Sequence, residues 1–198
     1  RFPLPDSRRN PRPVAPRISH LAFRTSHFAP RISPFALPQM SLRRMMKPHR
    51  KWMQKAFREA ERAYDADEVP VGAVVVKDQQ IIGRGHNMVE QLNDPTAHAE
   101  IIAITAACDT LGQKFLTDCT LYVTLEPCPM CAGAIVHARL DRLVFGAFDE
   151  KAGATSTLYN IVQDERLNHQ VEVVSGLDSE RAGGILRDFF RQKRASGQ

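Results

Sequence analysis

Four residues carry chemistry that depends on their type and spacing: His98, Glu100, Cys128 and Cys131. Proteins bind zinc through imidazole and thiolate groups, and catalytic zinc sites commonly use three protein ligands and leave the fourth position to water. Cys128 and Cys131 are three residues apart, so at a helix start both thiols face one side, where the helix dipole favours the thiolate. His98 can supply the third ligand. We therefore expect these three side chains to hold one Zn²⁺ ion.

Glu100 is separated from His98 by one residue, so it can reach a water molecule on the metal without being a ligand itself. Zinc lowers the pKa of bound water to about 7, which provides a nucleophile at neutral pH. Glu100 would take the water proton, deliver it to a ring nitrogen and pass a second proton to the departing amine. The residues thus predict hydrolytic removal of an amino group from an electron-poor ring, with ammonia as a product.

A lone Cys-x-x-Cys pair is also typical of structural zinc sites and of redox pairs. A closed structural site would need a fourth ligand, for which Cys108, Cys119 and His137 are the nearby candidates. Burial is the preferred interpretation of the first two, and a position on a helix surface is preferred for His137. The presence of His98 and Glu100 beside the cysteine pair favours the catalytic interpretation.

Strands that alternate with helices predict an α/β sheet covered on both faces, with a hairpin at its beginning. Helices are expected over residues 52–66, 97–111, 128–139, 158–162 and 178–194, and strands over 71–77, 80–86, 120–125, 142–146 and 171–174. Asp78-Gln79 would form the hairpin connection, and the segment from Asn93 to Thr96 offers capping groups for the second helix. His98 and Glu100 would lie in the first turn of one helix, and both cysteines in the first turn of the next.

The two motifs, His98-Ala99-Glu100 and Pro127-Cys128-Pro129-Met130-Cys131, match the H-x-E and P-C-x-x-C signature of zinc deaminases. Over roughly residues 50–194 the chain also resembles the bacterial tRNA-specific adenosine deaminase family. The similar segments are Val69 to Ala73, Asn87, Asp94 to Ala97, Tyr122 to Ala134 and Val144 to Gly153.

This resemblance implies a three-layer α-β-α, cytidine-deaminase-like fold with a five-stranded mixed sheet. It implies hydrolysis of the wobble adenosine in a tRNA anticodon to inosine, by a cytoplasmic homodimer with one zinc ion per subunit. The expected partner is the anticodon stem-loop of tRNA, with arginine tRNA as the expected substrate. Which tRNAs are edited and whether DNA is tolerated do not follow from the sequence.

The resemblance also implies which residues contact the substrate. Asn87 would hydrogen-bond the flipped nucleotide, while Val69 and Pro127 would contribute to the substrate pocket. Asp149 and Lys151 would meet the RNA backbone. Asn87 could instead be a turn residue, but its place at the end of a predicted strand beside the site favours the pocket.

The last predicted helix ends in an aromatic pair followed by basic residues, and Phe190, Lys193 and Arg194 are candidates for contact with phosphates and splayed bases. Phe189 and Phe190 are at least as typical of packing as of stacking, and the basic residues are also typical of a solvated helix end. Phe148 stands where a more polar residue is expected in bacterial relatives, which bears on how the flanking nucleotides are read.

With 198 residues, 22.2 kDa and 43% apolar residues, the chain can bury one sizeable core, and one zinc deaminase domain is expected over residues 49–198. Residues 1–50 hold 11 basic residues, one acidic residue and nine of the 13 prolines, whereas the remainder holds 16 basic and 21 acidic residues. The basic pI of 9.2 therefore comes from the N-terminal segment. It is no argument that the folded domain binds nucleic acid.

Residues 1–48 show no helical or strand periodicity, and we expect this Pro- and Arg-rich segment to be disordered. It could be a transit peptide, a polyanion-binding arm, or upstream sequence that is not part of the functional protein. The third explanation is preferred, since Met40, Met45 and Met46 stand just before the first helical pattern. No apolar run is long enough for a membrane span, and four cysteines without an export signal fit a reducing cytoplasm. A transit peptide would instead indicate an organelle.

Other functions remain open at the level of sequence. A deaminase of free guanine, cytosine or dCMP would share the zinc chemistry and differ in its pocket. A riboflavin-pathway deaminase is less favoured, because that type commonly carries a separate reductase domain. A zinc-stabilised RNA-binding subunit without catalysis is the non-enzymatic alternative, and Glu100 argues against it.

Overall fold

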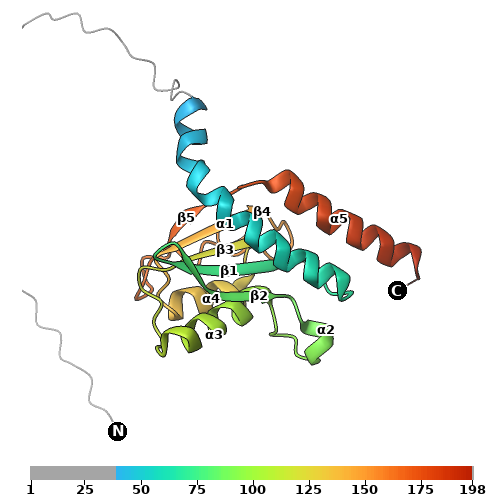
Figure 1. Ribbon diagram of the computed structural model, residues 1–198, viewed down its shortest axis with the longest axis horizontal. Helices are drawn as coiled ribbons and strands as arrows, with labels where there is room; N and C mark the ends of the chain where they lie inside the picture. Colours follow the sequence, from blue (N-terminus) through green and yellow to red (C-terminus); the bar gives the residue numbers. More distant parts are fainter. Residues whose placement is uncertain (1–38, 198) are drawn as a thin grey trace, which may run out of the picture. The chain divides into compact units, whose positions relative to one another are not determined.

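The computed structural model describes residues 39–197, with side chains from residue 48 onward. In this part of the chain, five strands form one mixed sheet in the order β2-β1-β3-β4-β5 (Figure 1). The strands are β1 (Gly72–Lys77), β2 (Gln80–His86), β3 (Thr120–Leu125), β4 (Arg142–Ala147) and β5 (Glu172–Val174). The β1 strand is antiparallel to β2 and β3, while β3, β4 and β5 run parallel. The predicted five-stranded mixed sheet is confirmed.

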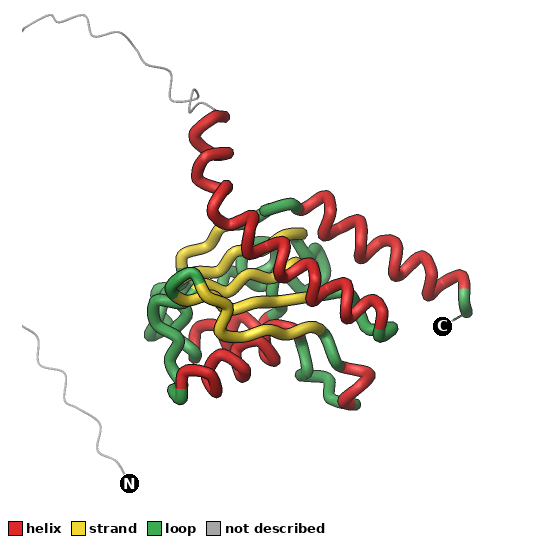
Figure 2. The backbone as a smooth tube through the Cα atoms, viewed as in Figure 1, coloured by secondary structure: helices red, strands yellow, loops and turns green. Residues whose placement is uncertain are grey.

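Helices cover both faces of this sheet (Figure 2). The helices α1 (Gln39–Asp65) and α5 (Ser179–Ala195) pack on one face, and α3 (Ala99–Leu111) and α4 (Pro129–His137) lie on the other. A short helix, α2 (Val89–Leu92), follows β2. The result is the predicted three-layer α-β-α architecture. Among the described residues, no helix combines the length and the apolar composition needed to span a bilayer.

The side chains of the central strands alternate between the two apolar layers, as the pleat of a strand requires. In β1, Ala73 and Val75 pack toward α3 and α4, whereas Val74 and Val76 pack toward α1. All four are buried. A sheet that is covered on both faces explains why its strands read as nearly continuous apolar runs rather than as an alternating pattern.

The hairpin between β1 and β2 has the two-residue connection that was predicted. Asp78 and Gln79 have φ angles of 48° and 60°. Two consecutive residues in the left-handed region are typical of a type I′ turn, whose twist matches that of the flanking strands.

The observed elements differ from the sequence predictions in several places. The first helix begins at Gln39 rather than at residue 52, so the predicted boundary between tail and domain at residues 48 and 49 falls within α1. Residues 1–38 of the predicted tail lie outside the described part. The helix predicted over residues 158–162 is wrong, because this segment consists of a bend, irregular backbone and the start of a turn. The α2 helix was not predicted.

The predicted side-chain cap of α3 is also wrong. Asp94 accepts hydrogen bonds from the backbone N–H and the hydroxyl of Thr96, at 2.8 and 2.7 Å, and so closes a local turn. The residue at the N-cap position is His98, whose side chain makes no capping bond. The imidazole of His98 is therefore not occupied by helix capping.

Helix α3 lies unusually close to strand β2, and two strand glycines, Gly83 and Gly85, permit this approach. A Cβ atom at Gly85 would stand 2.3 Å from the carbonyl oxygen of Ala99 and 2.6 Å from the backbone nitrogen of Ala103. On the helix side the contact is made by Ala99, Ala103 and Ala107, which are fully buried. Since Ala99 stands between His98 and Glu100, this contact sets the position of both side chains.

We predict that Gly85→Ala destabilises the fold, because the new methyl group meets helix backbone that cannot rotate away. The free energy of unfolding should fall by about 3 kcal/mol in urea denaturation, as for other overpacked interiors. Gly184→Ala is the matched control, since only the end of the Arg187 side chain comes within 4 Å of its new Cβ atom. That variant should gain about 0.5–1 kcal/mol from helix propensity. Equal stability of the two variants would contradict the prediction.

Candidate metal centre and substrate pocket

Two helix N-termini meet at the candidate metal centre. His98 is the N-cap residue of α3, and Cys128 is the N-cap residue of α4. Pro129 follows at the first helical position of α4, where its fixed φ and missing N–H are tolerated. Cys131 lies one turn further on and is fully buried. The sequence prediction therefore placed the ligands at the correct helix starts, close to the observed boundaries.

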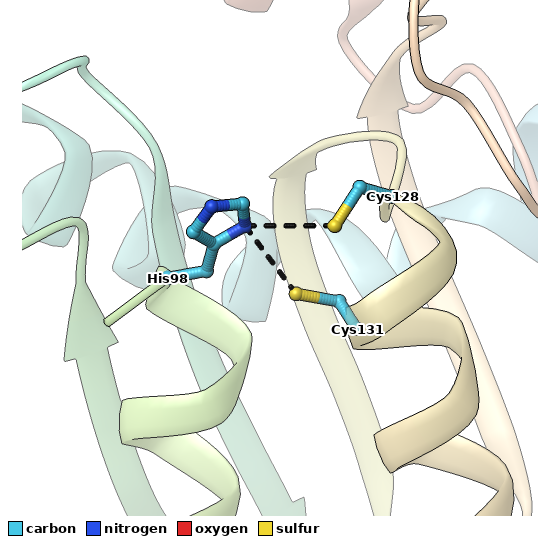
Figure 3. Close-up of side chains that lie close together, drawn as sticks. All are labelled: His98, Cys128 and Cys131. Atoms are coloured by element: carbon cyan, nitrogen blue, oxygen red, sulfur yellow. Dashed lines mark hydrogen bonds between the residues drawn. The ribbon is translucent and has the colours of Figure 1, made fainter. Parts of the chain in front are cut away.

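The three predicted ligands converge in space (Figure 3). The Nδ1 atom of His98 lies 3.6 Å from the Sγ atom of Cys128 and 3.5 Å from the Sγ atom of Cys131. One ligand atom from each residue lies within 4.8 Å of the other two. Three donors this close, two of them thiols, form a donor set suited to a tetrahedral soft metal ion.

The protonation of the two thiols is coupled. The hydrogen bond with Cys131, followed in importance by the one with His98, lowers the pKa of Cys128 to about 4. The same hydrogen bond with Cys128, and then burial, raises the pKa of Cys131. The hydrogen bond with Cys128 also raises the pKa of His98. These hydrogen bonds thus favour the thiolate form of Cys128, and a metal ion would require Cys131 to lose its proton as well.

The other candidate ligands do not belong to this cluster. Among the described residues, His98, Cys128 and Cys131 are the group whose geometry could hold a metal ion. The thiols of Cys108 and Cys119 point to the carbonyl oxygens of Lys114 and Thr117. His137 is exposed at the other end of α4. Three protein ligands leave a coordination position open, as catalytic sites do.

Glu100 lies in the first turn of α3, and its side chain is only 4% exposed. Burial raises the pKa of Glu100 to about 7. A carboxyl group with a pKa near neutrality can both accept and donate a proton under physiological conditions. This is the property that the proton transfers of hydrolysis need.

A pocket of about 900 Å³ opens beside the cluster and is lined by His98, Glu100 and Cys128. Its volume lies in the range of pockets that enclose a small organic ligand. Other parts of the lining come from the segment before β1, from α2 and from the end of α5. The lining includes the carboxyl groups of Asp67, Glu68, Glu90, Glu100, Glu126 and Asp149.

The structure brings most of the predicted substrate-binding residues to this pocket. Val69, Asn87, Asp149, Phe190 and Lys193 line it. Pro127 is buried outside the lining, and Lys151 and Arg194 are exposed outside it.

The end of α5 reaches the pocket through its aromatic pair and one ammonium group. Phe189 is 5% exposed and packs edge-on against Tyr64, with 5.7 Å between ring centroids. Phe190 is 44% exposed and lines the pocket. The ammonium group of Lys193 lies 2.6 Å from a carboxylate oxygen of Asp67. Of the aromatic pair, Phe189 therefore packs, and Phe190 offers a surface for stacking.

Two buried carboxylates organise the pocket walls. Neither of them was assigned a role in the sequence analysis. The first is Glu126, which is 2% exposed and stands directly before Pro127. Its two oxygens accept hydrogen bonds from the loop after β4. The donors are the backbone N–H groups of Asp149, Thr155, Ser156 and Thr157 and the hydroxyls of Thr155 and Thr157. Burial alone would raise the pKa of Glu126, but these hydrogen bonds outweigh it and lower the pKa.

The second unassigned carboxylate is Glu68, which is 1% exposed. It accepts hydrogen bonds from the side-chain amide of Asn87 and from the backbone N–H of Gln91. Neither glutamate belongs to an apolar periodicity. The one signal in the sequence is that each stands directly beside residues of the matched motifs, Val69 and Pro127.

Comparison with known proteins agrees with this geometry. The profile of the MafB19-like deaminase family matches residues 47–194. The tRNA-specific adenosine deaminase of Bacillus subtilis is 52% identical over 143 residues, which cover 72% of this chain and 89% of that protein. The protein of the same name from Aquifex aeolicus is 46% identical over the same share of this chain and is covered to 94%. The chain belongs to the family of tRNA-specific adenosine deaminases.

Solved structures place this adenosine deaminase family member among proteins with the same fold. A structure from a study of A-to-I editing by tRNA:A34 deaminases at the wobble position of transfer RNA is 46% identical, with a TM-score of 0.66. The match covers 69% of this chain and 99% of that one. Guanine deaminase from Nitrosomonas europaea is 25% identical, with a TM-score of 0.61, and the match covers 70% and 82% of the two chains.

We predict that Glu126→Gln loosens the loop after β4, because an amide nitrogen in place of one oxygen cannot accept its hydrogen bonds. Buried donors that lose their acceptor cost about 1–3 kcal/mol, so the free energy of unfolding should fall by about 2 kcal/mol. Hydrogen exchange of residues 149–157, measured by mass spectrometry, should accelerate. Glu165→Gln, at an exposed position, is the control and should leave both quantities unchanged. Unchanged exchange in Glu126→Gln would refute this role.

Proposed function

We propose that this protein uses one Zn²⁺ ion to convert adenosine to inosine by hydrolysis at the wobble position of a tRNA anticodon, releasing ammonia. The convergence of His98, Cys128 and Cys131 beside the buried Glu100, in a pocket of about 900 Å³, is the observation that carries this proposal. Membership of the tRNA-specific adenosine deaminase family supports the substrate.

The three ligands fit zinc by type and by geometry. One imidazole and two thiolates are borderline-soft donors, and the thiolate form of Cys128 is already favoured by its hydrogen bonds. Zinc held there would supply a Lewis acid that makes a water molecule acidic enough to attack at neutral pH. His98 and Cys128 line the pocket, so an ion held by these residues would be accessible from the pocket.

Glu100 is the residue that moves protons. Its carboxylate takes a proton from the attacking water and delivers it to N1 of the adenine ring. It then transfers the second water proton to the amino group on C6, so that the C–N bond breaks with ammonia as the leaving group. Water and adenosine are consumed, inosine and ammonia are formed, and Glu100 returns to its starting state.

The remaining pocket residues are proposed to hold the nucleotide and its neighbours. Val69 and Pro127 would shape the base pocket, and Asn87 would hydrogen-bond the flipped nucleotide. Phe190 offers an exposed ring on which a flanking base can stack, since base–aromatic stacking tolerates any base. Further contacts to the RNA backbone are proposed for Asp149, Lys151, Lys193 and Arg194.

The proposed assembly is a homodimer with one zinc ion in each subunit, acting on the anticodon stem-loop of arginine tRNA in the cytoplasm. Similarity to the structure of the tRNA:A34 deaminase study supports the substrate.

We predict that the purified, zinc-loaded protein contains about one zinc ion per chain. Cys131→Ala should abolish this content, because the two remaining side chains cannot hold the ion. Cys108→Ala is the matched control and should retain it, since Cys108 lies outside the cluster. Elemental analysis after gel filtration measures the result. Full zinc content in Cys131→Ala would exclude this site as the metal centre.

We predict that the zinc-loaded protein forms inosine in an arginine tRNA transcript with a wobble adenosine, and none in the same transcript with a wobble guanosine. Glu100→Ala should keep zinc and fold but lose about 10²- to 10⁴-fold in kcat, the usual contribution of a general acid–base group. Sequencing of the product after reverse transcription detects inosine. Wild-type turnover in Glu100→Ala would overturn the assignment of the proton shuttle.

A deaminase of free purine bases is the second candidate, because guanine deaminase from Nitrosomonas europaea shares the fold. Ammonia release from guanine, adenine, cytosine and dCMP distinguishes the two. Turnover of a free base without turnover of the transcript would favour the second candidate. An absence of both activities in zinc-loaded protein would favour a binding subunit without catalysis.

A further inference from the structure

Asn87 is held in the pocket wall by its own side chain and backbone. Its Nδ2 atom donates to the Oε2 atom of Glu68 at 2.9 Å, and the two side chains are 6% and 1% exposed. Its backbone N–H donates to the carbonyl oxygen of Val71 at 3.0 Å. Two hydrogen bonds thus fix the residue within the pocket wall.

Glu68 determines which end of the Asn87 amide faces it. The Oε1 atom of Glu68 accepts the backbone N–H of Gln91 at 2.7 Å, and a backbone N–H can only donate. An ionised carboxylate has no proton to give, so both of its oxygens need donors. In the amide of Asn87 only the nitrogen can donate. The orientation with the nitrogen toward Glu68 is therefore the one that satisfies both side chains.

The carbonyl oxygen of Asn87 is left at the other end of the amide. Within the described residues it has no hydrogen-bond partner, and no buried side-chain oxygen or nitrogen there lacks one. The Oδ1 atom is therefore accessible, and Asn87 is one of the residues that line the pocket. The wall presents a hydrogen-bond acceptor at this point.

We infer that Glu68 is a positioning residue, which fixes Asn87 so that its carbonyl oxygen accepts a hydrogen bond from an N–H or O–H group of the bound nucleotide. This inference rests on the proposed function. In an adenosine within an RNA chain, the ring nitrogens N1, N3 and N7 are acceptors, so the donors are the amino group on C6 and the ribose 2′-hydroxyl. Asn87 would accordingly recognise one of these two kinds of donor and repel a ring edge that offers acceptors alone.

A pair of substitutions tests the orientation. Asn87→Asp places a second carboxylate against Glu68, and kcat/KM on the tRNA transcript should fall by about 100-fold because the two charges repel in a buried site. Adding Glu68→Gln to Asn87→Asp should restore kcat/KM to within about tenfold of wild type. The new amide at position 68 can still accept from Gln91 through its oxygen, and its nitrogen can donate to the new carboxylate at position 87. That carboxylate keeps an acceptor oxygen facing the pocket.

The activity of the double variant shows whether the substrate needs a hydrogen-bond acceptor or a donor at position 87. If the substrate needed a donor, the double variant would remain as inactive as Asn87→Asp alone, and the inference would be overturned. Zinc content and thermal unfolding of each variant show whether lost activity reflects lost fold. A purely structural role for Glu68 predicts that KM of Asn87→Asp stays unchanged and that its apparent kcat falls only in step with its folded fraction.

Two substrates identify the donor. Transcripts with adenosine or with 2′-deoxyadenosine at the wobble position are compared in wild type and in Asn87→Ala. A loss confined to the adenosine transcript indicates the 2′-hydroxyl, and equal loss on both indicates the amino group. No loss on either transcript would overturn the inference.

An NMR measurement that needs no catalysis tests this inference independently of the proposed function. The side-chain amide signals of Asn87 are identified as those that are present in the ¹⁵N spectrum of the wild type and absent from the spectrum of Asn87→Asp. One of these protons should be protected from exchange with water by its bond to Glu68. Two unprotected protons would overturn the orientation. If the wild type forms no inosine while the proton is protected, the proposed function fails and the orientation stands.

Discussion

The structure depends on one geometric constraint, namely that side chains from the starts of two helices meet within 4.8 Å. Helix starts are suitable for this purpose because their N–H groups and dipoles favour the thiolates that a metal ion requires. Helix α4 begins shortly after β3, so the position of Cys128 is tied to the centre of the sheet. Helix α3 is tied to the sheet through the contact of Gly85 with the backbone of Ala99 and Ala103. Both ligand-bearing helices are thereby fixed to one rigid support.

The loops around the metal centre are held by hydrogen bonds to two buried carboxylates. Glu68 and Glu126 are carboxylates in the interior, where an isolated charge would be strongly unfavourable. Each offsets this cost with N–H or O–H donors from segments that have little regular structure of their own. Glu126 takes its donors from residues 149–157, and Glu68 takes its donors from Asn87 and from Gln91 in α2. Buried acceptors therefore order the walls of the pocket in places where apolar packing alone would not specify a conformation.

Much of this arrangement could be predicted from the sequence. The strands, the Asp78-Gln79 hairpin turn and the metal cluster were found because local patterns encode them: apolar runs, turn residues and ligand spacing. The α1 start at Gln39 was missed, since Pro48 and the proline-rich composition argued for a tail. The side-chain cap from Asp94 was wrong because a local turn to Thr96 competes for the same oxygen. The roles of Glu68 and Glu126 depend on partners from other segments, which no local pattern contains.

Within the described part of the chain, the lining of the pocket contains six acidic residues and one lysine. The ammonium group of Lys193, which also lines the pocket, lies against Asp67 and offsets only part of this charge. A purine ring is neutral and enters such a cavity at little electrostatic cost, whereas the dianionic phosphate of a mononucleotide is repelled. In a polymer the phosphodiesters can stay at the rim while a single base swings inward. An acidic lining of this kind would favour a base presented by a chain over the same base carried by a free nucleotide.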